Sequence, residues 1–134
     1  MNKIDRIKKK KIKQLKKYYN KLLLKQHKEN FNSMNSSLDY FYTYIMYMRD
    51  VLLLQSADPE KDTTINSMTL ALNSFSEYCS CIYKYYTIEN GVAVARTDLD
   101  LNKEEIAKKY AEEREKNWNT FWLIISSCME GWFE

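Results

Sequence analysis

The sequence predicts an all-α protein: a helical bundle of about four helices whose N-terminal helix is extended and basic. Two glycines and one proline among 134 residues leave little material for the tight turns of a many-stranded sheet. A heptad pattern of apolar residues runs through positions 65–86. Hydrophobic residues (45%) and charged residues (29%) are both plentiful, which argues against general disorder.

The first helix is predicted over about residues 3–31. Its apolar residues recur with 3-4-3 spacing at Ile12, Leu15, Tyr19 and Leu22, and lysines cover the rest. The apolar stripe disappears around residues 8–11, so we expect the first two or three turns to project from the body. The sequence therefore divides a single domain into a basic N-terminal helix or arm, 1–31, and a helical bundle body, 32–134.

The second helix is predicted over about residues 37–57, after a polar break with Ser36 as its N-cap. It should end before Pro59, which disfavours helical geometry at the preceding residue. Apolar residues lie nearly all round it, which is typical of a central, buried helix. One seam contains Leu38, Phe41, Ile45, Met48 and Leu52.

The third helix, about residues 59–86, has the most regular pattern in the chain. Its heptad positions are Ile65, Met68, Leu72, Phe75, Cys79, Ile82 and Tyr86. Asn90-Gly91 follows, and two interpretations stay open. The pair either ends a helix with a left-handed glycine or forms a type I′ turn of a small β-hairpin near 86–95.

The fourth helix begins with a capping box, because Asn102 is a good N-cap and Glu105 stands three residues later. The first half of this helix alternates acids and lysines, as a solvated face does. The second half is aromatic and apolar, with Trp118, Phe121, Trp122, Ile125, Met129, Trp132 and Phe133.

Charge is distributed unevenly along the chain. The first 28 residues contain twelve Lys/Arg and one acid, whereas the remainder contains nine Lys/Arg and seventeen Asp/Glu. The small net charge of +3 therefore conceals a strongly basic segment and an acidic body. Such asymmetry is typical of a protein that meets a polyanion or another strongly charged partner.

The small numbers of histidine and glycine residues argue against an enzyme. The single histidine, His27, leaves no material for a nucleophilic triad or a histidine-based metal site. Gly91 and Gly131 cannot form a phosphate-cradling loop or a dinucleotide fingerprint. The adjacent glutamates at 104–105 and 112–113 are explained by helical pairing with Lys108, Lys109 and Lys116, which follow Glu104, Glu105 and Glu112 by four residues. We predict a non-enzymatic protein without a cofactor.

No metal is predicted either. The segment 98–109 imitates the start of an EF-hand loop, but Lys103 replaces the required glycine and Lys109 the bidentate glutamate. Cys79, Cys81 and Cys128 have no zinc-site spacing, and an odd number of thiols fits a reducing compartment. Neither a signal peptide nor a membrane span is evident. We expect a cytoplasmic protein, in the host cytoplasm if it is viral.

The lysine-rich helix is the main candidate site. Lysines suit phosphate contact without base reading, and Arg6 alone could make bidentate base contacts. The predicted nucleic-acid or partner-binding residues on this helix are Lys8, Lys9, Lys10, Lys11, Lys13, Lys16, Lys17 and Lys21. A protein partner, a merely solvated face and an anionic membrane surface stay open as alternatives.

Tyrosine is the second unusual feature, with eleven residues. Tyr40 and Tyr44 share one face of the second predicted helix, and they are candidate stacking platforms for bases. The competing interpretation is packing within the core or between subunits, with the hydroxyls at the rim. Because so much aromatic surface is hard to bury in one small core, we expect a homo-oligomer or a protein partner.

The predicted function is therefore a helical binding or adaptor protein that engages a nucleic acid or a nucleoprotein machine as an accessory subunit, regulator or inhibitor. Abundant Lys, Asn, Ile and Tyr are typical of AT-rich genomes and favour a phage, plasmid or AT-rich bacterial origin. One alternative is a structural or assembly subunit of a virion or complex. Another is an inhibitor that blocks a host nucleic-acid-binding enzyme through its acidic body.

Overall fold

A computed structural model describes residues 2–28, 34–55 and 59–133. Of the described residues, 84% are helical, and a single two-stranded hairpin accompanies the helices, so the all-α prediction is confirmed. The chain divides into two compact units, Met1–Leu72 and Asn73–Glu134. Helix α3 (Pro59–Ser80) begins in the first unit and ends in the second.

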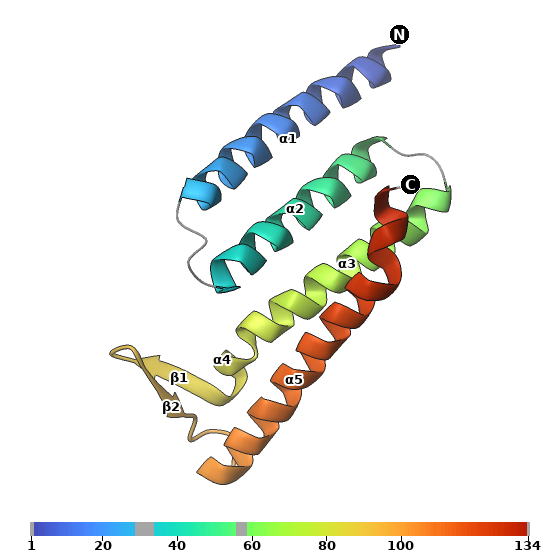
Figure 1. Ribbon diagram of the computed structural model, residues 1–134. Coiled ribbons are helices and arrows are strands. Elements are labelled where there is room, and N and C mark those ends of the chain that lie inside the picture. Colours follow the sequence, from blue (N-terminus) through green and yellow to red (C-terminus); the bar gives the residue numbers. More distant parts are fainter. Residues whose placement is uncertain (1, 29–33, 56–58, 134) are drawn as a thin grey trace. The chain divides into compact units, whose positions relative to one another are not determined.

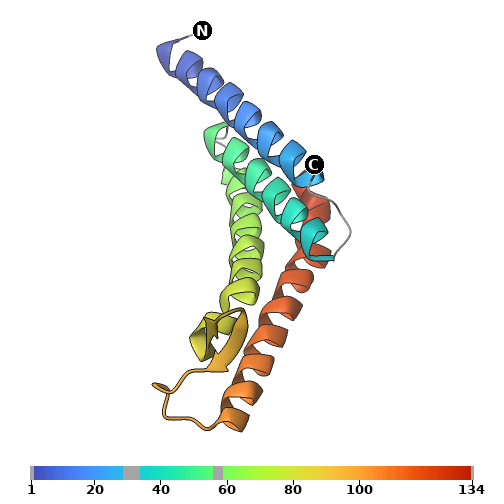
Figure 2. The ribbon, with the colours of Figure 1, turned by 90° about the vertical axis from the view of Figure 1, so that its left-hand side faces the viewer.

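The first unit is built around an antiparallel helix pair. Helix α1 (Lys3–Lys28) and helix α2 (Met34–Gln55) lie side by side in both views (Figures 1 and 2). Asn2 caps α1, because its Oδ1 accepts a hydrogen bond from the Asp5 amide at 2.9 Å. The predicted end of this helix, residues 29–31, lies outside the described residues. Helix α2 begins at Met34, so the prediction of Ser36 as its N-cap is wrong.

Ser36 lies inside the first turn of α2, and the sequence around it gives a physical reason. The predicted polar break contains no glycine or proline that would stop a helix, and serine and asparagine are tolerated in a first turn, so α2 begins before Ser36. Within α2, Thr43 and Ile45 are buried, but Leu53 is 56% exposed. The expectation that α2 is buried on all sides therefore holds for only part of its circumference.

Polar and aromatic contacts hold α1 against α2. The Tyr19 hydroxyl donates to Asp50 Oδ2 at 2.5 Å, and the Tyr19 ring stacks on Tyr47 with centroids 5.1 Å apart. Nearer the loop, Gln26 Nε2 donates to Thr43 Oγ1 at 2.9 Å. Burial, followed by the hydrogen bond to Asp50, raises the pKa of the Tyr19 phenol, which therefore stays protonated.

In the second unit α3 is followed by helix α4 (Ile82–Tyr85) and a hairpin of β1 (Tyr86–Glu89) and β2 (Val92–Ala95). Asn90 and Gly91 have φ angles of 51° and 78°, the two positive values that a type I′ turn requires. The hairpin interpretation of Asn90-Gly91 is therefore correct. Since α3 already ends at Ser80, the pair has no helix to cap.

The predicted heptad holds through Phe75 and then fails. Met68, Leu72 and Phe75 are buried, but Cys79 is exposed and Cys81 takes the buried position instead. The reason is that Tyr78, three residues after Phe75, meets Trp118 of helix α5 (Lys103–Cys128). Cys81, three residues further on, is buried, so the packed side of the helix moves away from Cys79. The third helix ends at Ser80 and is shorter than the predicted span of 59–86.

Helix α5 (Lys103–Cys128) packs on the end of α3 within the second unit and continues as a 3₁₀ turn, Met129–Phe133. Phe75 and Phe121 approach with ring centroids 5.3 Å apart, and Tyr78 and Trp118 with centroids 4.9 Å apart. The predicted capping box is confirmed, because the Glu105 amide donates to Asn102 Oδ1 at 2.8 Å.

Candidate basic interface

The side of α1 turned away from α2 carries an uninterrupted row of cations. Successive residues of a helix are rotated by about 100°. Tyr19 and Leu23 are buried and mark the inner side of α1, and the residues on the opposite side recur three or four positions apart. That outer row consists of Lys3, Arg6, Lys10, Lys13, Lys17 and Lys21, all of them exposed.

The outer row is open to a ligand. Its side chains form no ion pair with any carboxylate of the described residues, and the row contains no acid. From the first to the last residue it extends over about 27 Å at 1.5 Å per residue. A row of this length, with a cation in nearly every turn, presents positive charge along a line, as an extended polyanion requires.

The other predicted lysines lie in different settings. Lys8 and Lys9 border a hollow of about 310 Å³ beside Leu54 and Gln55, at the C-terminal end of α2. Lys11 borders a larger groove between the two helices, and Lys16 is exposed on the flank of α1. The predicted set therefore splits: Lys10, Lys13, Lys17 and Lys21 share the outer row, and the remaining four do not.

Tyr40 and Tyr44 are not brought together with the lysines at 8–11. Tyr44 is 40% exposed and meets the edge of Tyr47 at 6.3 Å between centroids, while Tyr40 is half-buried. Tyr44 precedes Leu54 by ten residues, which corresponds to about 15 Å along α2. The two predicted groups thus lie at different levels of the helix pair.

Sequence reasoning missed the tyrosine that does accompany the lysines. Tyr18 is 59% exposed and meets the buried Tyr19 edge-on, with centroids 5.1 Å apart. The signal was available, because adjacent helical residues point about 100° apart. Once Tyr19 is assigned to the inner seam, Tyr18 has to lie off that seam, beside Lys17 and Lys21.

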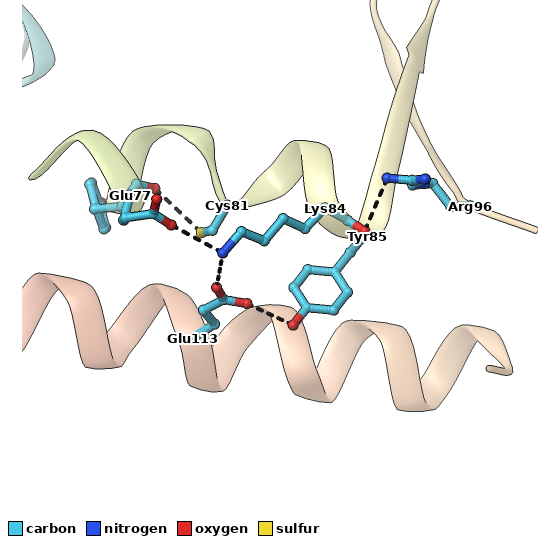
Figure 3. Close-up of polar contacts among 7 residues, drawn as sticks. Glu77, Cys81, Lys84, Tyr85, Arg96 and Glu113 are labelled. Atoms are coloured by element: carbon cyan, nitrogen blue, oxygen red, sulfur yellow. Dashed lines mark hydrogen bonds and ion pairs between the residues drawn. The ribbon is translucent and has the colours of Figure 1, made fainter. Parts of the chain in front are cut away.

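In the second unit, by contrast, a lysine is held between two carboxylates (Figure 3). Lys84 Nζ lies 3.0 Å from Glu77 Oε2 and 2.6 Å from Glu113 Oε1. The Tyr85 hydroxyl donates to Glu113 Oε2 at 2.6 Å. These contacts, with Lys84 the larger influence, lower the pKa of the Glu113 carboxyl, and Glu113 followed by Glu77 raises the pKa of Lys84.

This cluster is built for ion pairing, and its groups are poorly suited to acid–base or nucleophilic work. A glutamate with a lowered pKa is a weak base. Burial raises the pKa of the nearby Cys81 thiol, which disfavours the nucleophilic thiolate. At the start of the EF-hand-like segment, the Asp98 carboxylate accepts two hydrogen bonds from Arg96, at 3.0 and 2.6 Å.

A metal cluster and a membrane-crossing helix are both absent from the part of the chain that the structure describes. No group of three or more His, Cys, Asp or Glu side chains converges there in a way that could hold a metal ion. The described helices also include none that is both long and apolar enough to cross a bilayer. The three cysteines are free thiols.

Comparison with protein-family models, with curated proteins and with solved structures finds no match to this chain.

Proposed function

We propose that this protein is a non-enzymatic nucleic-acid-binding protein that holds the phosphate backbone with the outer row of α1. It would serve as an accessory subunit or regulator of a nucleoprotein complex. The observation that carries the proposal is the outer row itself, because its exposed cations have no carboxylate partner among the described residues.

The chemistry of the row supports backbone contact rather than base reading. Five of its six members are lysines, which act as flexible point charges, and Arg6 is the single member with a bidentate fork. Phosphate contacts position a protein on nucleic acid without selecting a sequence. Binding should accordingly tolerate many sequences and weaken steeply as salt rises, since released counterions drive it.

The test removes the charge of the row without changing the helix. The variant replaces four lysines of the outer row by glutamine, which has a similar helix propensity and no charge. The substitutions are Lys10→Gln, Lys13→Gln, Lys17→Gln and Lys21→Gln. Fluorescence anisotropy with labelled oligonucleotides over a salt series should show a log affinity–log salt slope that is less steep by about 3 than in the wild type.

A matched control removes the same charge elsewhere. Lys103, Lys108, Lys109 and Lys116 are exposed on α5, and their joint replacement by glutamine should leave the slope close to that of the wild type. If both variants lose affinity equally, net charge alone governs binding and the outer row is no interface. Absence of binding to DNA and RNA even at low salt would overturn the proposed function.

A further inference from the structure

An open groove of about 520 Å³ lies between α1 and α2, next to the outer row. Its apolar lining is formed by Leu15 together with Leu53 and Leu54. The Tyr18 ring lies in the same lining and is 59% exposed, and Leu53 is 56% exposed. A half-exposed phenol ring beside leucines offers a flat apolar surface that water covers poorly.

Three polar side chains complete the lining of the groove. Lys11 brings a cation, Gln14 an amide that both donates and accepts, and Asp50 a carboxylate. Asp50 accepts hydrogen bonds from Tyr19 and Arg49, and a carboxylate has further lone pairs for a ligand donor. The groove thus combines an aromatic face with donors and acceptors at its margin.

Two lysines of α1 lie on the same side of the helix as the Tyr18 ring. Lys21 follows Tyr18 by three residues, a spacing that puts two helical side chains next to each other. Lys11 precedes Tyr18 by seven residues and therefore lies on the same side, two turns away. A strand whose phosphates follow the outer row would consequently bring its bases to the mouth of the groove.

We propose that the groove receives an unpaired base of single-stranded nucleic acid, stacked on Tyr18, while the backbone follows the outer row. The proposal rests on the proposed function and adds the class of ligand. Aromatic platforms next to a basic track are the usual means of holding single strands, whereas the bases of a duplex keep their faces stacked inside.

The mixed charge of the groove favours a base over the other occupant of basic apolar grooves, an acidic peptide helix. Asp50 would repel the carboxylates of such a helix. A base instead presents N–H donors that a carboxylate can accept and a π face that fits a phenol ring. Lys11 is then available for the phosphate of the same nucleotide.

The experiment compares two oligothymidylate probes of equal charge. Both are fluorescein-labelled and about 12 nucleotides long, a typical footprint, and one carries abasic residues at alternate positions. Anisotropy titrations of the full-length protein should show the normal strand bound about 5- to 100-fold more tightly than the abasic strand. A duplex of the same length should be bound less tightly than the single strand.

Variants locate the preference for bases. Tyr18→Ala should abolish the difference between the two probes, and Tyr18→Phe should keep it, since the ring remains. Tyr44→Ala is the matched control, because Tyr44 is also exposed but lies on α2 and outside the lining of the groove, so this variant should keep the difference. Far-UV circular dichroism checks that each variant is folded.

The possible failures separate the two proposals. If normal and abasic strands bind equally, binding is by charge alone. If Tyr18→Ala retains the difference, the bases are held somewhere other than on Tyr18. In either case the groove proposal fails and the proposed function stands. Tighter binding of the duplex than of the single strand would also overturn the groove proposal. If neither strand binds at low salt, both proposals fail.

Discussion

The lysines of the outer row and Lys84 of the second unit carry the same charge in opposite settings. Lys84 lies between Glu77 and Glu113, so its charge is used within the fold. Lys10, Lys13 and Lys17 face solvent without a carboxylate partner among the described residues. The unpaired lysines of the outer row repel one another along α1, which lowers the stability of the helix slightly. A bound anion would offset this repulsion.

The comparison teaches that net charge is a poor guide to where a protein binds. The second unit contains lysines and arginines as well, but ion pairs with carboxylates engage two of them, Lys84 and Arg96. Only a cation that its own fold leaves unpaired can give its full charge to a partner. Three predictions test this contrast, ordered from the largest to the smallest expected change in the free energy of unfolding.

The largest effect is expected from loosening α1 on its inner side. Leu23 is 7% exposed, so Leu23→Ala should lower the free energy of unfolding by about 2–4 kcal/mol through lost burial and a cavity. Leu24 is the adjacent residue and 54% exposed, and Leu24→Ala should cost less than about 0.5 kcal/mol. Urea unfolding followed by circular dichroism measures both, and equal costs would mean that α1 is not held by this side.

An intermediate effect is expected at Glu113. Glu113→Gln weakens its contacts to Lys84 and Tyr85, and at neutral pH it should cost about 1 kcal/mol, because the half-exposed Lys84 is screened by water. Folding lowers the pKa of Glu113, so its stabilisation is complete above the ordinary glutamate pKa of about 4.3 and is lost as pH falls below that value.

Urea unfolding at a series of pH values checks this sign. The difference between the wild type and Glu113→Gln should shrink as the pH drops below about 4. Glu112→Gln changes the exposed neighbour and should follow the wild type throughout. If the difference between Glu113→Gln and the wild type stays constant down to about pH 3, the contacts of Glu113 contribute nothing to the loss of stability at acid pH.

The smallest effect on stability is expected from the outer row. The fourfold lysine-to-glutamine variant should change the free energy of unfolding by less than about 0.5 kcal/mol in total, since no native contact is lost. Relief of repulsion between lysines four residues apart acts in the stabilising direction. A loss above about 3 kcal/mol in the same urea assay would show that these lysines hold structure, and the contrast with Lys84 would disappear.

Local sequence was sufficient for several features of this chain. The capping box at Asn102 and Glu105 was predictable, because both partners lie within one turn. The hairpin was foreseen as one of two interpretations, and the positive φ angles of Asn90 and Gly91 decided between them. The heptad prediction failed at Cys79 because periodicity alone does not reveal that Tyr78 meets Trp118 of α5 and that Cys81 takes the buried position.

The sequence by itself determined that the first helix is basic, that its inner seam includes Tyr19, and that the protein is mainly helical. These properties depend on composition and on the 3.6-residue period, which act within a few residues. Only the tertiary structure decided which lysines lie away from α2, that Tyr18 lies beside an open groove, and that Lys84 meets Glu113, 29 residues away. Such surroundings are created by segments distant in the chain, and a local pattern carries no information about them.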